Sequence, residues 1–293
     1  MVGMQARNAT SIRFAQSILA RRVGVSAGVF VALFILVFTC IFTVVGQGAD
    51  TLIMYAFVAR TPFPGFLSAL LHTLVSIPAL LVVAAIILLA IVVRGRFALL
   101  FRVSLVLVLS NASTQILKTA LARPNLGVGH ALTNSFPSGH VTLVASIALV
   151  LLASVPPAWK TLVGVVGWVV TAAVGIVVMG LGWHRFSDVV GAILIVLIFA
   201  MLALPSEWDP GRSPHQGRTM AAFAWVCLLA SAVAIPVLLW GSRALLVTPQ
   251  SAAALQNMAE APVLGVGLVM AGSVFVTALC ALSIHEVGHL RGN

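Results

Sequence analysis

The chain has 293 residues, of which 61% are hydrophobic and 8% are charged. Soluble domains carry about 25% charged residues, so this composition excludes an ordinary soluble protein and favours one that lies in a lipid bilayer. The backbone of a segment in lipid must satisfy its own hydrogen bonds, and the apolar runs are too long and uniform for barrel strands. The membrane-spanning segments are therefore expected to be helices, in an all-α polytopic membrane helical bundle.

Eight apolar runs predict eight membrane spans along the chain. The first follows an arginine-bearing N-terminal segment and is longer than the apolar region of a signal peptide, which has about 7–15 residues, so it is expected to be a retained helix. A short interfacial helix is expected over Asp50–Arg60. The expected spans are Val23–Val45, Leu67–Val93, Leu99–Leu117, Val141–Val155, Thr161–Leu181, Val189–Leu204, Ala221–Trp240 and Val263–Ser283.

The most polar internal stretch follows the sixth expected span and divides the chain. It suggests a six-span core followed by two additional transmembrane helices. The expected segments are a cytoplasmic N-terminal segment (1–22), the core (23–204), a polar linker (205–220), the C-terminal pair (221–284) and a cytoplasmic tail (285–293). Three cysteines, at positions 40, 227 and 280, fall inside apolar runs and are expected to be packing residues.

The distribution of lysine and arginine predicts the orientation of the bundle. With the N-terminus inside, eleven of the 16 basic residues fall on the inner side and five on the outer side. Cytoplasmic loops carry the excess of positive charge, so both termini are expected to be cytoplasmic. The same bias accounts for the net charge of +10 without nucleic-acid binding, and three of the five outer cations fall between Lys118 and Asp188.

Two polar motifs interrupt the apolar runs on the predicted outer face. Lys118 and Arg123 precede a loop that ends in Ser138-Gly139-His140, where the fourth span is expected to begin. Free N–H groups at a helix start, together with nearby cations, bind anions such as phosphate. The second motif contains His184 and Asp188, whose spacing of four residues would bring them side by side on a helical turn. A carboxylate that orients a histidine can make the imidazole a nucleophile or a base.

These residues resemble the motifs of the type 2 phosphatidic acid phosphatase superfamily of lipid phosphate phosphatases. That family carries Lys-x6-Arg-Pro, Pro-Ser-Gly-His and Ser-Arg-x5-His-x3-Asp. The chain has Pro137–His140 in full and the His-x3-Asp half of the third motif, at the ends of expected spans three to six. The resemblance covers about residues 23–204.

The resemblance implies a role for each matching residue. His184 would attack phosphorus, Asp188 would hold its tautomer, and His140 would protonate the leaving oxygen and then activate water. Oxygens of the phosphoryl group would be held by Lys118, Arg123, the Ser138 hydroxyl and the Gly139 N–H. No metal or other cofactor is expected, since fixed donors and cations would stabilise the charge.

The chain departs from the family pattern at two places. Four residues rather than six separate Lys118 from Arg123, and the Ser-Arg pair of the third motif falls on Val177-Val178. A phosphate-binding arginine is therefore missing. Arg185, next to the predicted nucleophile, is the candidate replacement, and a solvated or headgroup-binding charge is the alternative for it.

The predicted function is a metal-independent membrane phosphatase. Its partners would be the lipid bilayer and a lipid phosphate or polyprenyl diphosphate substrate at the outer face of the cell membrane. A weakened or inactive lipid-phosphate-binding scaffold is the first alternative, favoured by Val178. A zinc intramembrane protease is the second, because His285-Glu286-Val287-Gly288-His289 matches the HExxH pattern, although no later residue offers a third ligand.

Overall fold

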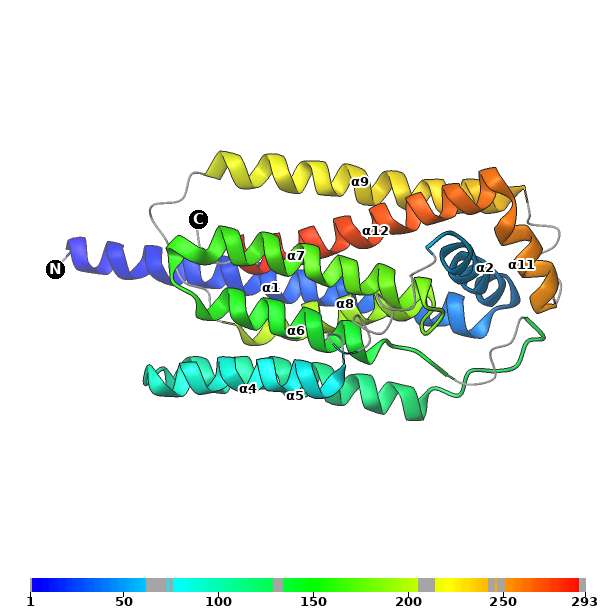
Figure 1. Cartoon of the computed structure of the whole chain (residues 1–293). Helices are drawn as coiled ribbons and strands as arrows, with labels where there is room; N and C mark the ends of the chain where they lie inside the picture. The colour runs from blue at the N-terminus through cyan, green and yellow to red at the C-terminus, as the bar shows by residue number, and fades with distance from the viewer. Residues whose placement is uncertain are drawn as a thin grey trace.

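The computed structural model describes residues 2–61, 73, 76–128, 134–204, 214–241, 246 and 251–289. In these parts of the chain it contains ten α-helices, and the spans run side by side (Figure 1). The helices are α1 (Val2–Phe42), α2 (Val44–Arg60), α4 (Ile77–Val93), α5 (Phe97–Ala120), α6 (Gly139–Ser154), α7 (Pro157–Gly180), α8 (Phe186–Ala203), α9 (Pro214–Trp240), α11 (Ala252–Glu260) and α12 (Pro262–His289).

The helices confirm an all-α, polytopic membrane fold. Six of them are long and apolar enough to cross a bilayer, in α1, α5, α7, α8, α9 and α12. The other two expected spans correspond to shorter apolar helices, α4 with 17 residues and α6 with 16, against the about 20 residues that a full crossing needs. The expected start of the second span at Leu67 lies outside the described residues, as does most of the predicted polar linker.

Helix α8 lies at the centre of the bundle. It contacts α1, α2, α5, α6 and α12, and 78% of its residues are buried. A helix that is apolar on every side belongs in the interior of a bundle, and the sequence Val189–Leu197 is uniformly apolar. The polar residues at the start of α8 are therefore enclosed by protein.

Helix α2 lies across one end of the bundle and is seen nearly end-on in Figure 1, where the spans run across the view. The short helix expected over Asp50–Arg60 is present, but it begins at Val44, because the Thr43 hydroxyl caps it by accepting the N–H of Gly46 at 3.0 Å. Half of α2 is buried against α1, α7, α8, α11 and α12. The end of the bundle that α2 covers is the one where α5 ends and α6 and α8 begin.

The C-terminal helices pack into the bundle. Helix α12 contacts α2, α7, α8 and α9, and the Trp168 indole N–H of α7 donates to the Thr277 carbonyl at 2.8 Å. The guanidinium of Arg60, at the end of α2, donates to three carbonyls where α11 meets α12, those of Ala259, Glu260 and Ala261. Cations at a helix C-terminus bind its unpaired carbonyls favourably, so this contact ties α2 to the C-terminal helices.

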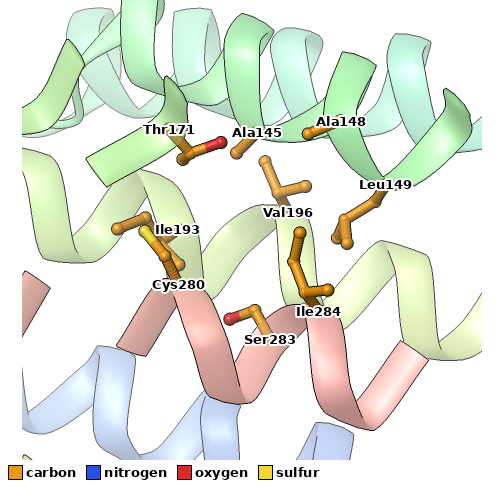
Figure 2. Close-up of a pocket in the computed structure, with 9 residues that line it drawn as sticks. All are labelled: Ala145, Ala148, Leu149, Thr171, Ile193, Val196, Cys280, Ser283 and Ile284. Carbon is orange, nitrogen blue, oxygen red and sulfur yellow. The ribbon is translucent and has the colours of Figure 1, made fainter. Parts of the chain in front are cut away.

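A small pocket marks the contact between α12 and the other spans (Figure 2). Its walls come from α6, α7, α8 and α12, and its few polar groups are Thr171, Cys280 and Ser283. The Thr171 and Ser283 hydroxyls donate to carbonyls of their own helices. The pocket is a packing defect between apolar helices, and none of the predicted site residues line it. The lining residues are Ala145, Ala148, Leu149, Thr171, Ile193, Val196, Cys280, Ser283 and Ile284.

Helix α1 begins and α12 ends at the same end of the bundle, opposite the end covered by α2 (Figure 1). Which end faces the cytoplasm stays a prediction, as does the division into a six-span core and a C-terminal pair.

Gly191 of α8 provides a first test of the packing. A Cβ there would lie 2.4 Å from Cε2 of Phe136, a fully buried ring in the loop before α6. We expect Gly191→Ala to reduce the free energy of unfolding by about 1–3 kcal/mol, the usual cost of overpacking. The measurement is the thermal unfolding midpoint in detergent, with Gly28→Ala as the control, since a Cβ at Gly28 contacts no described residue within 4 Å. Equal midpoints for the two variants would contradict this packing.

Candidate active site

The loop between α7 and α8 brings His184 next to Asp188, which lies in the first turn of α8. Gly182 adopts a φ of +71°, and the Val178 carbonyl accepts the N–H groups of Trp183 and His184 at 3.0 and 3.2 Å. His184 therefore precedes α8 rather than lying on it. Its Nδ1 nevertheless lies 3.3 Å from Oδ2 of Asp188, because Asp188 is the third residue of the helix and points back over its start.

One oxygen of Asp188 organises this turn. Oδ2 accepts the Ser135 hydroxyl at 2.6 Å and the Arg185 backbone N–H at 2.9 Å, in addition to its contact with His184. The Asp188 side chain is fully buried, and its Oδ1 has no partner among the described residues. A buried carboxylate needs several donors to offset its desolvation. The interactions of Oδ2 therefore join the loop between α7 and α8 to the loop before α6.

The start of α6 lies opposite His184. Ser138 is fully buried, caps α6 through the Val141 N–H, and donates its own N–H to the Asp188 carbonyl at 2.9 Å. His140 follows in the first turn, and its ring centroid is 6.3 Å from that of His184. The two imidazole rings therefore lie near each other at this end of the bundle.

Lys118 completes this side of the site from the last turn of α5. A Cβ built on Gly139 would lie 3.7 Å from Lys118 Nζ and 3.8 Å from Gln115 Nε2, so both side chains reach the backbone at the start of α6. A glycine at this position lets an anion approach the helix N-terminus and the ammonium group together.

Two buried guanidinium groups lie near Asp50 and Asp188. Arg123 Nη2 lies 3.6 Å from Asp50 Oδ2 and donates to the Cys40 carbonyl, whereas its Nε and Nη1 have no partner among the described residues. Arg185 Nη1 donates to the Ser135 hydroxyl at 3.2 Å, and its Nε is likewise without a partner in that part of the chain. Buried donors without partners are costly, so these N–H groups are suited to bind an anion.

Asp50 of α2 reaches the same cluster. Its Oδ1 accepts the Ser187 backbone N–H at 2.8 Å and its Oδ2 accepts the Ser187 hydroxyl at 2.5 Å. The first turn of α8 is thus capped by two carboxylates, Asp50 and Asp188, which satisfy N–H groups that have no partner within the helix.

Charges at this end of the bundle influence one another. Burial lowers the pKa of Arg185, and the positive charge of Arg123 adds to this effect, while Asp50 and Asp188 oppose it. Burial raises the pKa of Asp50, and the negative charge of Asp188 adds to this effect, while both guanidiniums and the Ser187 hydroxyl favour the charged form. The charge of Asp50 therefore depends on the two arginines.

All eight residues predicted from the sequence lie at this end of the bundle. His184, Asp188 and Arg185 form one hydrogen-bonded group, Ser138, Gly139, His140 and Lys118 form a second beside it, and Arg123 is joined to the first through Asp50 and Ser187. Val178, at the position of the family's arginine, is fully buried and contributes its carbonyl to the loop.

Sequence reasoning did not single out Ser135 or Asp50. Ser135 stands in the loop that ends in Ser138-Gly139-His140, but nothing in its spacing indicated which acid it would contact. A signal for Asp50 was present, since an acidic residue is rare in so apolar a chain, but its partners are far from it in sequence.

The C-terminal HExxH pattern lies at the opposite end of the bundle. Glu286 accepts a hydrogen bond from Arg21 of α1 at 2.9 Å, and its carboxylate is thereby used in an ion pair. The side chain of His289 lies outside the described residues. Within the described ranges, no three His, Cys, Asp or Glu side chains are grouped closely enough to hold a metal ion.

Comparison with known proteins gives one family match. Residues 99–212 match the PAP2 superfamily, a segment that holds α5 to α8 and every predicted site residue. The chain is thus a polytopic helical membrane protein, and it carries a PAP2 superfamily domain over residues 99–212. That domain indicates lipid phosphate phosphatase activity. No curated protein and no solved structure matches the chain.

Ser135 provides a test of the site geometry that does not depend on activity. Ser135→Ala removes the hydroxyl that bridges Asp188 and Arg185, and loss of a buried bond to a charged group costs about 1.5–3 kcal/mol. We expect a lower thermal unfolding midpoint in detergent. The control is Thr119→Ala, whose exposed hydroxyl donates only to carbonyls of its own helix. A midpoint equal to that of the control would show that the bridge is not formed.

Proposed function

We propose that the protein removes the terminal phosphoryl group from a lipid phosphate or polyprenyl diphosphate through a phosphohistidine intermediate. The observation that carries this proposal is the cluster itself: a carboxylate-paired histidine and a second histidine, flanked by buried guanidinium N–H groups without partners among the described residues. This combination provides a nucleophile, a general acid and an anion site together.

In the first step, His184 attacks phosphorus. A proton on Nδ1 that is donated to Asp188 leaves the Nε2 lone pair free, and the carboxylate stabilises the positive charge that develops on the ring. As the N–P bond forms, the P–O bond to the lipid breaks. His140 donates a proton to the departing oxygen, and the lipid leaves as an alcohol or as a monophosphate.

In the second step, His140 removes a proton from water and the resulting hydroxide attacks phosphorus. The N–P bond breaks, inorganic phosphate leaves, and His184 and His140 regain their starting protonation states. The overall reaction consumes one water molecule for each phosphoryl group released. Lys118, the Ser138 hydroxyl and the Gly139 N–H would stabilise the negative charge on the equatorial oxygens from the α6 side.

Arg123 and Arg185 would stabilise the same charge from the opposite side. Arg185 is 4% exposed, and its guanidinium approaches the site from the residue next to His184. Val178 stands where the family has an arginine. The location of Arg185 supports its role as the replacement for that arginine, rather than as a solvated or headgroup-binding charge. Arginine forms paired charge-assisted hydrogen bonds with phosphate, which a lysine does not reproduce.

A lipid substrate suits a site at the end of an apolar bundle, because the headgroup can enter the polar cluster while the chains stay in the bilayer. The excess of basic residues on the side of the N-terminus supports a site on the extracytoplasmic face of the cell membrane, with both termini cytoplasmic. Such a site suits dephosphorylation of carrier lipids of the cell envelope or of phosphatidic acid.

The principal rival is a protein that binds lipid phosphate without hydrolysing it, which the missing Ser-Arg pair at Val177-Val178 favours. One assay separates the two: purified protein in detergent, a panel of lipid phosphates and EDTA, with released phosphate as the readout.

We expect phosphate release in EDTA by the wild-type protein and its loss, by at least a thousandfold, in His184→Ala, because this substitution removes the attacking atom. An acid-labile phosphoryl-enzyme should be trapped when the reaction is quenched in base, and it should be absent in His184→Ala. Phosphate release by His184→Ala at the wild-type rate would reject the assigned nucleophile. Binding without release by the wild-type protein would favour the scaffold, and chelator-sensitive proteolysis would favour the C-terminal HExxH pattern.

Arg185 is tested by a matched pair of substitutions. We expect Arg185→Ala to lower kcat/KM by about 10- to 100-fold, the cost of one charge-assisted hydrogen bond in the transition state. Arg185→Lys keeps the charge but not the planar fork, and it should recover only part of the loss. An Arg185→Ala enzyme with wild-type kcat/KM would reject Arg185 as the replacement for the missing arginine.

A further inference from the structure

Asp50 stands apart from the family motifs, since it lies on α2, 49 residues before the segment that matches the family begins. It is nevertheless 2% exposed and contacts two parts of the site, the first turn of α8 and the Arg123 guanidinium. Burying a carboxylate costs free energy of desolvation. A buried acid that contacts a site from outside the family motifs therefore calls for a specific electrostatic explanation.

Contacts at three points hold the helix that carries Asp50. Near its start, the Gln47 amide donates to the Ile41 carbonyl at 2.7 Å and to the Pro124 carbonyl at 2.9 Å. In its middle, Asp50 accepts from Ser187, and at its end Arg60 donates to the carbonyls between α11 and α12. The contact with Pro124 fixes the residue that follows Arg123. Helix α2 is therefore a rigid base for the arginine as well as for α8.

The contacts of Asp50 divide between its two oxygens. Among the described residues, Oδ1 accepts the Ser187 backbone N–H alone, whereas Oδ2 accepts the Ser187 hydroxyl and lies 3.6 Å from Arg123 Nη2. The ion pair uses one end of the guanidinium, and its Nε and Nη1 remain without partners among the described residues. A carboxylate on one edge of a planar guanidinium fixes the direction of the other edge.

We propose that Asp50 is a positioning residue that holds the Arg123 guanidinium, and through Ser187 the first turn of α8, in the geometry that binds the phosphoryl group. This inference rests on the proposed function. The first family motif is shortened here by two residues. In this proposal, α2 supplies the support for Arg123 that the shortened motif does not provide alone. Asp50 acts through Arg123 and Ser187 and has no contact with substrate.

Asp50→Asn separates positioning from charge. The asparagine oxygen can still accept the Ser187 N–H, so the cap on α8 is retained while the ion pair with Arg123 is lost. If Asp50 merely adds negative charge beside an anion site, its removal should tighten the binding of an anion. If it positions Arg123, its removal should weaken that binding.

The first experiment measures binding of orthovanadate, a phosphoryl-transfer mimic, by calorimetry on the full-length protein in detergent. We expect Asp50→Asn to weaken binding by at least tenfold, and Asp50→Ala to weaken it further because the cap is also lost. Thr51→Val is the matched control: Thr51 is the next residue of α2, is equally buried, and its hydroxyl has no partner among the described residues. The control should bind orthovanadate as the wild-type protein does. Unchanged or tighter binding by Asp50→Asn would overturn the proposal.

The second experiment is a double-mutant cycle on kcat/KM with Asp50→Asn and Arg123→Gln. If Asp50 acts through Arg123, the double variant should be no more than about threefold worse than Arg123→Gln alone, because interacting residues give non-additive effects. Losses that multiply would show that Asp50 acts independently of Arg123, for example through folding, and would overturn the proposal. Unfolding midpoints of all variants are measured alongside.

The two experiments distinguish this inference from the proposed function. If the wild-type protein hydrolyses lipid phosphate and Asp50→Asn matches it in orthovanadate binding and kcat/KM, the positioning role alone would be rejected. If the wild-type protein binds orthovanadate but hydrolyses no lipid phosphate, the proposed catalysis would be rejected. The orthovanadate-binding experiment would then decide the role of Asp50. A wild-type protein that neither binds orthovanadate nor hydrolyses any substrate would overturn both.

Discussion

The rest of the site depends on the burial of the polar first turn of α8. This helix occupies the centre of the bundle, so its unpaired N–H groups and the acids near them lie within protein. Two carboxylates cap this turn, Asp188 from within the helix and Asp50 from α2. Because charged groups away from water must be paired, each acid recruits further donors, and these donors are the residues of the candidate site. The central position of one helix thus leads to a connected polar network at its end.

The network explains how a shortened motif and a missing arginine can coexist with an intact cluster. Arg185 approaches from the loop between α7 and α8 and Arg123 from the loop after α5, and both are near Asp50 and Asp188. Two guanidiniums and two carboxylates nearly balance in charge, which limits the cost of burying any one of them. The N–H groups that remain without protein partners among the described residues are those that would bind phosphate in the proposed function.

Helix α2 and the C-terminal helices pack closely with the rest of the bundle. Arg60 ties α2 to the junction of α11 and α12, while α12 packs on α7 and α8. Helix α2 therefore links the C-terminal helices, which it contacts through Arg60, to Asp50 at the site. The chain outside the family segment contributes to the end of the bundle where the predicted site residues meet, and it does so by packing rather than by motif.

The sequence by itself determined the membrane class, the helical fold and the residues of the two motifs. Apolar composition allows only helices or closed barrels in lipid, and the spacing of His184 and Asp188 already indicated a pair. Tertiary structure alone decided how that pair forms, since His184 precedes α8 and meets Asp188 through a capped turn rather than along a helix face. It also decided the contacts of Ser135 and Asp50, whose partners lie 53 and 137 residues away. Contacts over such separations depend on how the helices pack, and the local sequence pattern does not determine that packing.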